Sequence, residues 1–167
     1  VLMGLIGIWN INFLNYSEQA ILPYDHRLRS LPLFLQQLDM ESNGKHVDRD
    51  GHPLECTTSP VIFGEAGTNG QHAFHQHLHQ GTSIVPCDFI GFAQAGHTLP
   101  EHHHALLANM LAQSQDMMWG RNSEETQAFL IEQGETQLQA EALAPAMSFD
   151  GNRPSNMLLA ESLSAQS

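Results

Sequence analysis

Residues 60–92 read PVIFGEAGTNGQHAFHQHLHQGTSIVPCDFIGF, and this stretch decides the fold. Residues 60–64 are short and apolar and are followed by the turn-rich segment 67–70, so they predict a buried strand. No helix-breaking residue occurs in 71–80 and a glycine comes next, which predicts a helix that ends there. Residues 83–92 are rich in Ile, Val and Phe and predict a second strand, with a proline that makes its middle irregular. A strand, a helix and a strand in this order are typical of a parallel sheet.

Strands and helices also alternate on both sides of this unit. Before it, residues 20–24 predict a buried strand, and residues 31–40 predict an amphipathic helix because their Leu and Phe side chains recur at helical spacing. After it, residues 107–118 predict a helix and residues 156–160 predict a last strand. The alternation predicts an α/β fold: a three-layer αβα sandwich with a mostly parallel sheet covered on both faces.

The remaining segments are predicted to form helices and loops around this sheet. The apolar opening, residues 1–14, is too short to span a membrane and lacks the basic start of a signal peptide, so we interpret it as a buried helix. Residues 44–51, with glycines and charges, predict a loop. Ser123 is placed to cap a helix, and residues 133–146, rich in Gln, Ala and Glu, predict a helical appendage that faces solvent.

The composition is that of one globular domain. Apolar residues make up 41% of the chain and charged residues 14%, which argues against disorder. The formal net charge is −12, with only six Lys and Arg residues, so the surface repels nucleic-acid phosphates and anionic lipid. Cys56 and Cys87 do not make a disulfide framework or a zinc site; each is predicted to be a small buried side chain in a reducing, intracellular setting.

Eleven histidines raise the hypothesis of a metal site. His72, His75 and His79 would share one face of a helix, and residues 102–104 are three further histidines after a glutamate. No HExxH-type pattern is present, and three consecutive histidines cannot all face one ion from a helix. Scattered surface and interface histidines are therefore the favoured interpretation, and no metal is predicted.

Two other patterns could carry chemistry. Gln37 and Glu41 are four residues apart, so both side chains would emerge on one side near the end of a helix, where the helix dipole favours a carboxylate that acts as a base. Residues 64–72 place three glycines between a strand and a helix, where backbone can approach a ligand closely, although they match no nucleotide-binding motif. Such patterns are solvated helix ends or plain turns more often than functional sites, so the residues alone leave the function open.

Several longer motifs occur in one register, and they resemble the glucose-6-phosphate isomerase (phosphoglucose isomerase) family. The similarity runs from about residue 5 to residue 159 and needs no large gap. The motifs are DMESNGK at 39–45, GE at 64–65, GTNGQHAF at 67–74, HQGT at 79–82, PCDF at 86–89, Asn109 with LAQ at 111–113, and GNRPSN at 151–156.

The resemblance implies an aldose–ketose isomerase that interconverts glucose 6-phosphate and fructose 6-phosphate, in glycolysis and gluconeogenesis. Glu41 would be the base that moves a proton between C1 and C2 through a cis-enediolate, and Gln37 would contact the sugar phosphate. His72 would help to open the pyranose ring, reaching the substrate from the partner subunit of a homodimer. The resemblance implies a cytoplasmic enzyme that needs no cofactor or metal.

The resemblance also has limits. Ala66 stands where the family commonly has proline, and His75 where it has an aromatic residue. The family's arginine signature, phosphate-binding loop and lysine motif do not occur, so residues 1–167 are expected to be a partial sugar-isomerase-type domain of a larger two-domain enzyme, truncated at both ends and inactive alone. A non-catalytic, sugar-phosphate-binding regulatory module of the same fold is the alternative. Glu41 and His72, both in full motif context, favour the enzyme.

Overall fold

The computed structural model describes residues 1–165 and contains one open sheet. Each neighbouring pair of its strands runs parallel, so the predicted parallel α/β fold is confirmed. The strands are β1 (Glu18–Pro23), β2 (Val61–Gly64), β3 (Cys87–Phe92) and β4 (Ser155–Ala160), in the order β2-β1-β3-β4.

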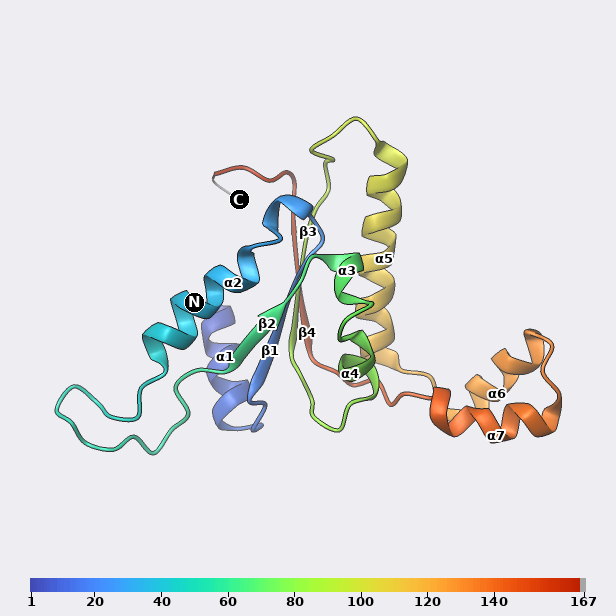
Figure 1. Cartoon of the computed structure of the whole chain (residues 1–167), viewed down its shortest axis with the longest axis horizontal. Coiled ribbons are helices and arrows are strands. Elements are labelled where there is room, and N and C mark those ends of the chain that lie inside the picture. Colours follow the sequence, from blue (N-terminus) through green and yellow to red (C-terminus); the bar gives the residue numbers. More distant parts are fainter. Residues whose placement is uncertain (166–167) are drawn as a thin grey trace.

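Helices lie on both sides of this sheet, which gives the predicted three layers (Figure 1). Helices α3, α4 and α5 lie on one side, and α1 and α2 lie on the other. In chain order the helices are α1 (Leu2–Asn12), the 3-10 turn η1 (His26–Leu28), α2 (Leu31–Leu35), the π-helical segment η2 (Gln36–Glu41), α3 (Gly67–Gly70), α4 (His75–Gln80), α5 (Pro100–Trp119), α6 (Ser123–Glu132) and α7 (Gln137–Met147). In residues 1–165, no helix is both long enough and apolar enough to cross a membrane.

The core lies between the sheet and helices α4 and α5. Strands β1 and β3 are the central strands, and their residues Leu22 and Phe89 are fully buried, as are Met110 and Met117 of α5. Burial of one such side chain contributes about 1.5–3 kcal/mol. The other buried members of this cluster are Ala20, Tyr24, Leu78, Val85 and Cys87.

Residues 1–14, predicted to be a buried helix, are mostly exposed, and so is much of the apolar face of the amphipathic helix predicted at residues 31–40. In α1 only Ile11 is buried, and Trp9 has 55% of its surface exposed. Phe34 and Leu38, on the predicted apolar face of residues 31–40, are also more than half exposed. Both segments are helical, as predicted, but their apolar side chains are largely exposed. An apolar pattern does not say which other segment will cover it, and within residues 1–165 no segment covers these side chains.

Several element boundaries differ from the predicted ones, and α5 begins at Pro100, well before the predicted residue 107. The turn at residues 67–70 is one turn of helix, and α4 begins at His75 rather than Gln71, because Phe74 has φ −144° and ψ 0° and breaks the helical path. Strand β3 begins at Cys87, directly after a proline that has no backbone N–H to donate to a sheet.

The prediction that both cysteines are buried holds for Cys87 and is wrong for Cys56, which lies exposed in a loop; both thiols are free.

Helices α6 and α7 form a hairpin that extends away from the sheet, as the predicted appendage requires (Figure 1). The cap of α6 is Asn122, one residue before the predicted Ser123. Its side chain accepts a hydrogen bond from the Glu125 backbone N–H, and the Glu125 carboxylate accepts one from the Asn122 N–H. Helix α7 has the same reciprocal cap between Thr136 and Gln139. Local sequence therefore specifies both helix starts.

The central strand β3 carries one buried carboxyl group, that of Asp88, which has 4% of its surface exposed. It accepts hydrogen bonds from Gln19 Nε2 on β1, at 2.6 Å, and from Asn156 Nδ2 on β4, at 2.8 Å. Burial raises the pKa of Asp88, and the two amide hydrogen bonds oppose that change only in part. The group thus ties three strands together and is costly to ionise.

We expect this carboxyl group to make stability depend on pH. The folded protein holds the Asp88 proton to a higher pH than the unfolded chain, so Asp88 increasingly destabilises the fold as the pH rises from the ordinary value of 3.8 through the raised folded pKa. The Asp88→Asn variant lacks this titration. Chemical denaturation of both proteins at a series of pH values should show the wild type losing unfolding free energy relative to the variant across that window. A difference that stays the same at every pH would contradict the assignment.

Candidate functional site

Gln37 and Glu41 lie together on η2, beside strand β2. Both side chains line one open cavity of ≈ 820 Å³, whose other wall is β2 from Val61 to Phe63. The amide of Gln36 fixes η2 to the sheet, since Gln36 Nε2 donates to the Ile62 carbonyl at 2.9 Å. The sequence spacing therefore predicted correctly that Gln37 and Glu41 emerge on one side.

The backbone under these two residues is π-helical rather than α-helical, which the sequence did not predict. The α-helical turns end at Leu35, and the wider π turns run from Gln36 to Glu41. Segments of this kind are rare and occur frequently at functional sites. The π-helical segment thus contains both residues, Gln37 and Glu41, that the sequence spacing singled out.

The carboxylate of Glu41 is exposed and has no hydrogen-bond or ion-pair partner within residues 1–165. Lys45 Nζ donates to the backbone carbonyl of Glu41, at 2.8 Å, and so holds the end of the segment without touching the carboxylate. A side chain in this setting can accept a proton from a bound molecule.

His72 lies elsewhere, in the turn that joins α3 to α4. Its side chain is exposed and does not line the cavity of Gln37 and Glu41. The turn itself is hydrogen-bonded: His72 N donates to the Asn69 carbonyl and Ala73 N to the Gly70 carbonyl, each at 3.0 Å. The structure thus brings Gln37 and Glu41 together and leaves His72 outside their cavity.

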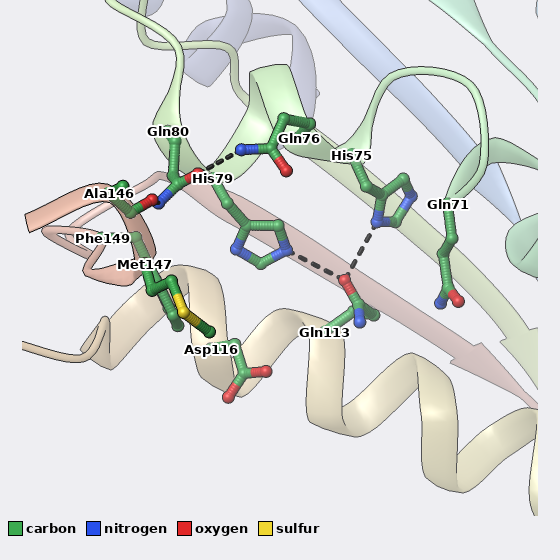
Figure 2. Close-up of a pocket in the computed structure, with 10 residues that line it drawn as sticks. All are labelled: Gln71, His75, Gln76, His79, Gln80, Gln113, Asp116, Ala146, Met147 and Phe149. Carbon is green, nitrogen blue, oxygen red and sulfur yellow. Dashed lines mark hydrogen bonds between the residues drawn. The ribbon is translucent and has the colours of Figure 1, made fainter. Parts of the chain in front are cut away.

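A partly buried polar cluster between α4 and α5 was not predicted as a unit (Figure 2). Gln113 Oε1 lies 2.9 Å from His75 Nδ1 and 2.9 Å from His79 Nε2, at one side of a cavity of ≈ 460 Å³. Burial lowers the pKa of His75, so its imidazole is neutral at neutral pH. Helical spacing pairs the two histidines, but no local pattern could identify Gln113, which is more than thirty residues away.

The histidines do not form a well-supported metal centre. His72 leaves the face that it was predicted to share with His75 and His79, because α4 begins after it. His75 and His79 each place one ring nitrogen 2.9 Å from Gln113 Oε1, and within residues 1–165 no third His, Cys, Asp or Glu side chain lies with both at ligand distance. In α5, His103 is buried beside the Ala93 carbonyl and its neighbours 102 and 104 are exposed, so the three point apart as predicted.

One exposed loop gathers Asp48, Asp50 and His52 within ligand distance of each other. Asp48 Oδ1 already accepts the backbone N–H groups of Asp50 and His52, at 2.8 and 2.9 Å. These bonds lower the pKa of Asp48, with the His52 backbone N–H the largest cause. The arrangement is explained by closure of the loop.

Comparison with known proteins gives one consistent family. The phosphoglucose isomerase family model matches residues 1–167. Over 159 residues the chain is 52% identical to a glucose-6-phosphate isomerase of Methylococcus capsulatus, covering 95% of this chain and 29% of the relative. It is 49% identical over 166 residues to that of Gloeobacter violaceus, covering 99% and 29%.

A solved structure agrees with these relatives. The crystal structure of a glucose-6-phosphate isomerase from Chlamydia trachomatis superposes with a TM-score of 0.77 at 38% identity, over 98% of this chain and 29% of that one. The chain therefore spans about 29% of the length of the curated relatives that it matches.

Proposed function

Since this chain belongs to the phosphoglucose isomerase family, we propose that it is part of an enzyme that interconverts glucose 6-phosphate and fructose 6-phosphate. In this proposal residues 1–167 are a partial sugar-isomerase-type domain of a larger two-domain, homodimeric enzyme of the cytoplasm. The relatives are named as isomerases, so the regulatory alternative has no support among them. Two free thiols fit a reducing compartment.

One observation carries the proposal: Glu41 and Gln37 face the same cavity from one π-helical segment. A carboxylate without a partner in residues 1–165, held beside an amide that can donate hydrogen bonds, suits proton transfer on a bound polar anion. Glu41 removes the proton from C2 and returns it to C1, and the intermediate is a cis-enediolate. Gln37 holds the phosphorylated substrate by its amide N–H.

His72 has a separate step in the proposal. An exposed imidazole can exchange a proton with the ring oxygen and so open the pyranose before the carboxylate acts. Its position outside the Gln37–Glu41 cavity fits a histidine that completes the site of the partner subunit. Neither step routes through a metal or an organic cofactor.

The direct test is an assay of the full-length protein with fructose 6-phosphate, in which a coupled dehydrogenase detects glucose 6-phosphate. We expect turnover without added metal or cofactor. Failure of the correctly folded, full-length dimer to convert the substrate would exclude the proposal.

Replacing Gln37 with leucine should weaken substrate binding more than turnover. A hydrogen bond to a charged group contributes about 1.5–3 kcal/mol, so KM should rise by about 10- to 100-fold while kcat changes little. Initial rates over a range of fructose 6-phosphate concentrations give both constants. As a control, a sugar alcohol without phosphate should inhibit wild type and variant equally; weaker inhibition of the variant would place Gln37 away from the phosphate.

A further inference from the structure

Three elements meet beneath the turn that carries His72. Gln71, the residue before it, points its amide toward α5, where Nε2 donates a short hydrogen bond to Asn109 Oδ1. The same Nε2 lies 3.5 Å from the hydroxyl of Tyr24, which follows β1. A single side chain thus links the turn to α5 and to the end of the central strand β1.

The ring of Tyr24 forms the floor on which the turn rests. Tyr24 is fully buried, and a Cβ atom added to Gly67 would come within 2.5 Å of its ring. Only glycine permits this approach. Phe74, at the far end of the turn, packs edge-on against Phe63 of β2, with ring centroids 5.2 Å apart. The turn is therefore held at its first residue, Gln71, and at its last, Phe74, and the helix α3 before it rests on Tyr24 at Gly67.

The side chain of His72 contributes nothing to this anchoring. Its side chain is exposed and makes no hydrogen bond within residues 1–165, so the backbone of the turn decides where the imidazole stands. Of the three contacts, the Gln71–Asn109 bond is adjacent to His72 in sequence and is the one polar link of the turn to α5 in the described part of the chain. A shift of about 1 Å in a reacting group can lower a rate by about 100-fold.

We infer that Gln71 and Asn109 are positioning residues for His72. Their hydrogen bond fixes the turn so that the imidazole is presented at the place where ring opening occurs. The inference rests on the proposed role of His72 and assigns neither Gln71 nor Asn109 to contact with substrate.

The chain supplies a matched control for general destabilisation. Gln113 lies one turn along α5 from Asn109 and also bonds across to the segment after the turn, through His75 and His79 (Figure 2). Within residues 1–165 it makes no hydrogen bond to Gln71 or His72. Loss of Gln113 loosens the α4–α5 contact without touching the link beside His72.

The experiment separates ring opening from enolisation in the full-length protein. One substrate is cyclic glucose 6-phosphate; the other is an aldose phosphate too short to close a ring, whose enolisation is followed as exchange of its C2 proton with solvent. Gln71→Leu and Asn109→Leu should each lower kcat/KM for the cyclic sugar by about tenfold or more and change proton exchange on the open sugar by less than about twofold. Asn109→Asp keeps an acceptor for Gln71 and should restore most of the loss.

Each outcome decides between named explanations. Equal losses on both substrates, or the same selective loss in Gln113→Leu, would overturn the positioning role. If His72→Ala is selective for the cyclic sugar and the Gln71 and Asn109 variants are not, this inference fails and the proposed function stands. If His72→Ala itself shows no selectivity, both fail. Asn109→Ala replaces the leucine variant if the latter does not fold.

Discussion

Replacing Glu41 with glutamine is expected to lower kcat of the full-length protein by about 10²–10⁴-fold, the contribution of a positioned general base. The amide keeps the shape of the side chain and can still form a hydrogen bond, but it cannot accept the C2 proton. Because Glu41 makes no interaction through its carboxylate within residues 1–165, the change should not disturb the fold. Substrate binding should stay nearly intact.

Initial rates with fructose 6-phosphate and a direct binding measurement test this expectation together. The dissociation constant of a competitive inhibitor should change little while turnover falls, and exchange of the C1 proton of fructose 6-phosphate with solvent should fall in parallel. Equal losses of binding and turnover would point to a structural role for Glu41. As a matched control on the same segment, Asp39→Asn alters a carboxylate that does not line the Glu41 cavity, and it should leave kcat near that of the wild type.

The second large effect is expected at His72. If its imidazole serves ring opening, His72→Ala should severely lower turnover of cyclic glucose 6-phosphate and affect enolisation of an acyclic sugar phosphate much less. Acid–base catalysis of one step contributes about 10²–10⁴-fold, so the difference between the two substrates should be of that order. The side chain is exposed, so its removal should cost little stability. A comparable loss on both substrates would assign His72 to packing or positioning.

The same variant tests whether two subunits share a site. When Glu41→Gln and His72→Ala proteins are mixed under conditions that exchange subunits, each mixed dimer has one site with both lesions and one site with neither. Part of the activity should therefore return. If mixed dimers are shown to form and the mixture stays inactive, His72 acts within its own chain.

The sequence by itself determined the sheet. Residues 20–24, 60–64 and 156–160 are strands in the structure, with ends within two residues of the predicted ones, because apolar runs this short, bounded by turn residues, favour buried strands over helices. It was also predictable that the side chains of Gln37 and Glu41 emerge on the same side, since residues four apart stay on one side of a helical segment even when it is π-helical. The motifs around them pointed to the family that the comparisons then showed.

Tertiary structure alone decided how distant segments meet. The exposure of Trp9 depends on whether another segment covers α1. The link from Gln71 to Asn109 and the bridge from Gln113 to His75 depend on which segments pack together, and they join residues that share no local pattern. Local sequence fixes backbone conformation through hydrogen bonds and burial between near neighbours, whereas these contacts arise only when the sheet brings α4 and α5 onto one face. For the same reason, the position of His72 outside the Glu41 cavity could be known only from the fold.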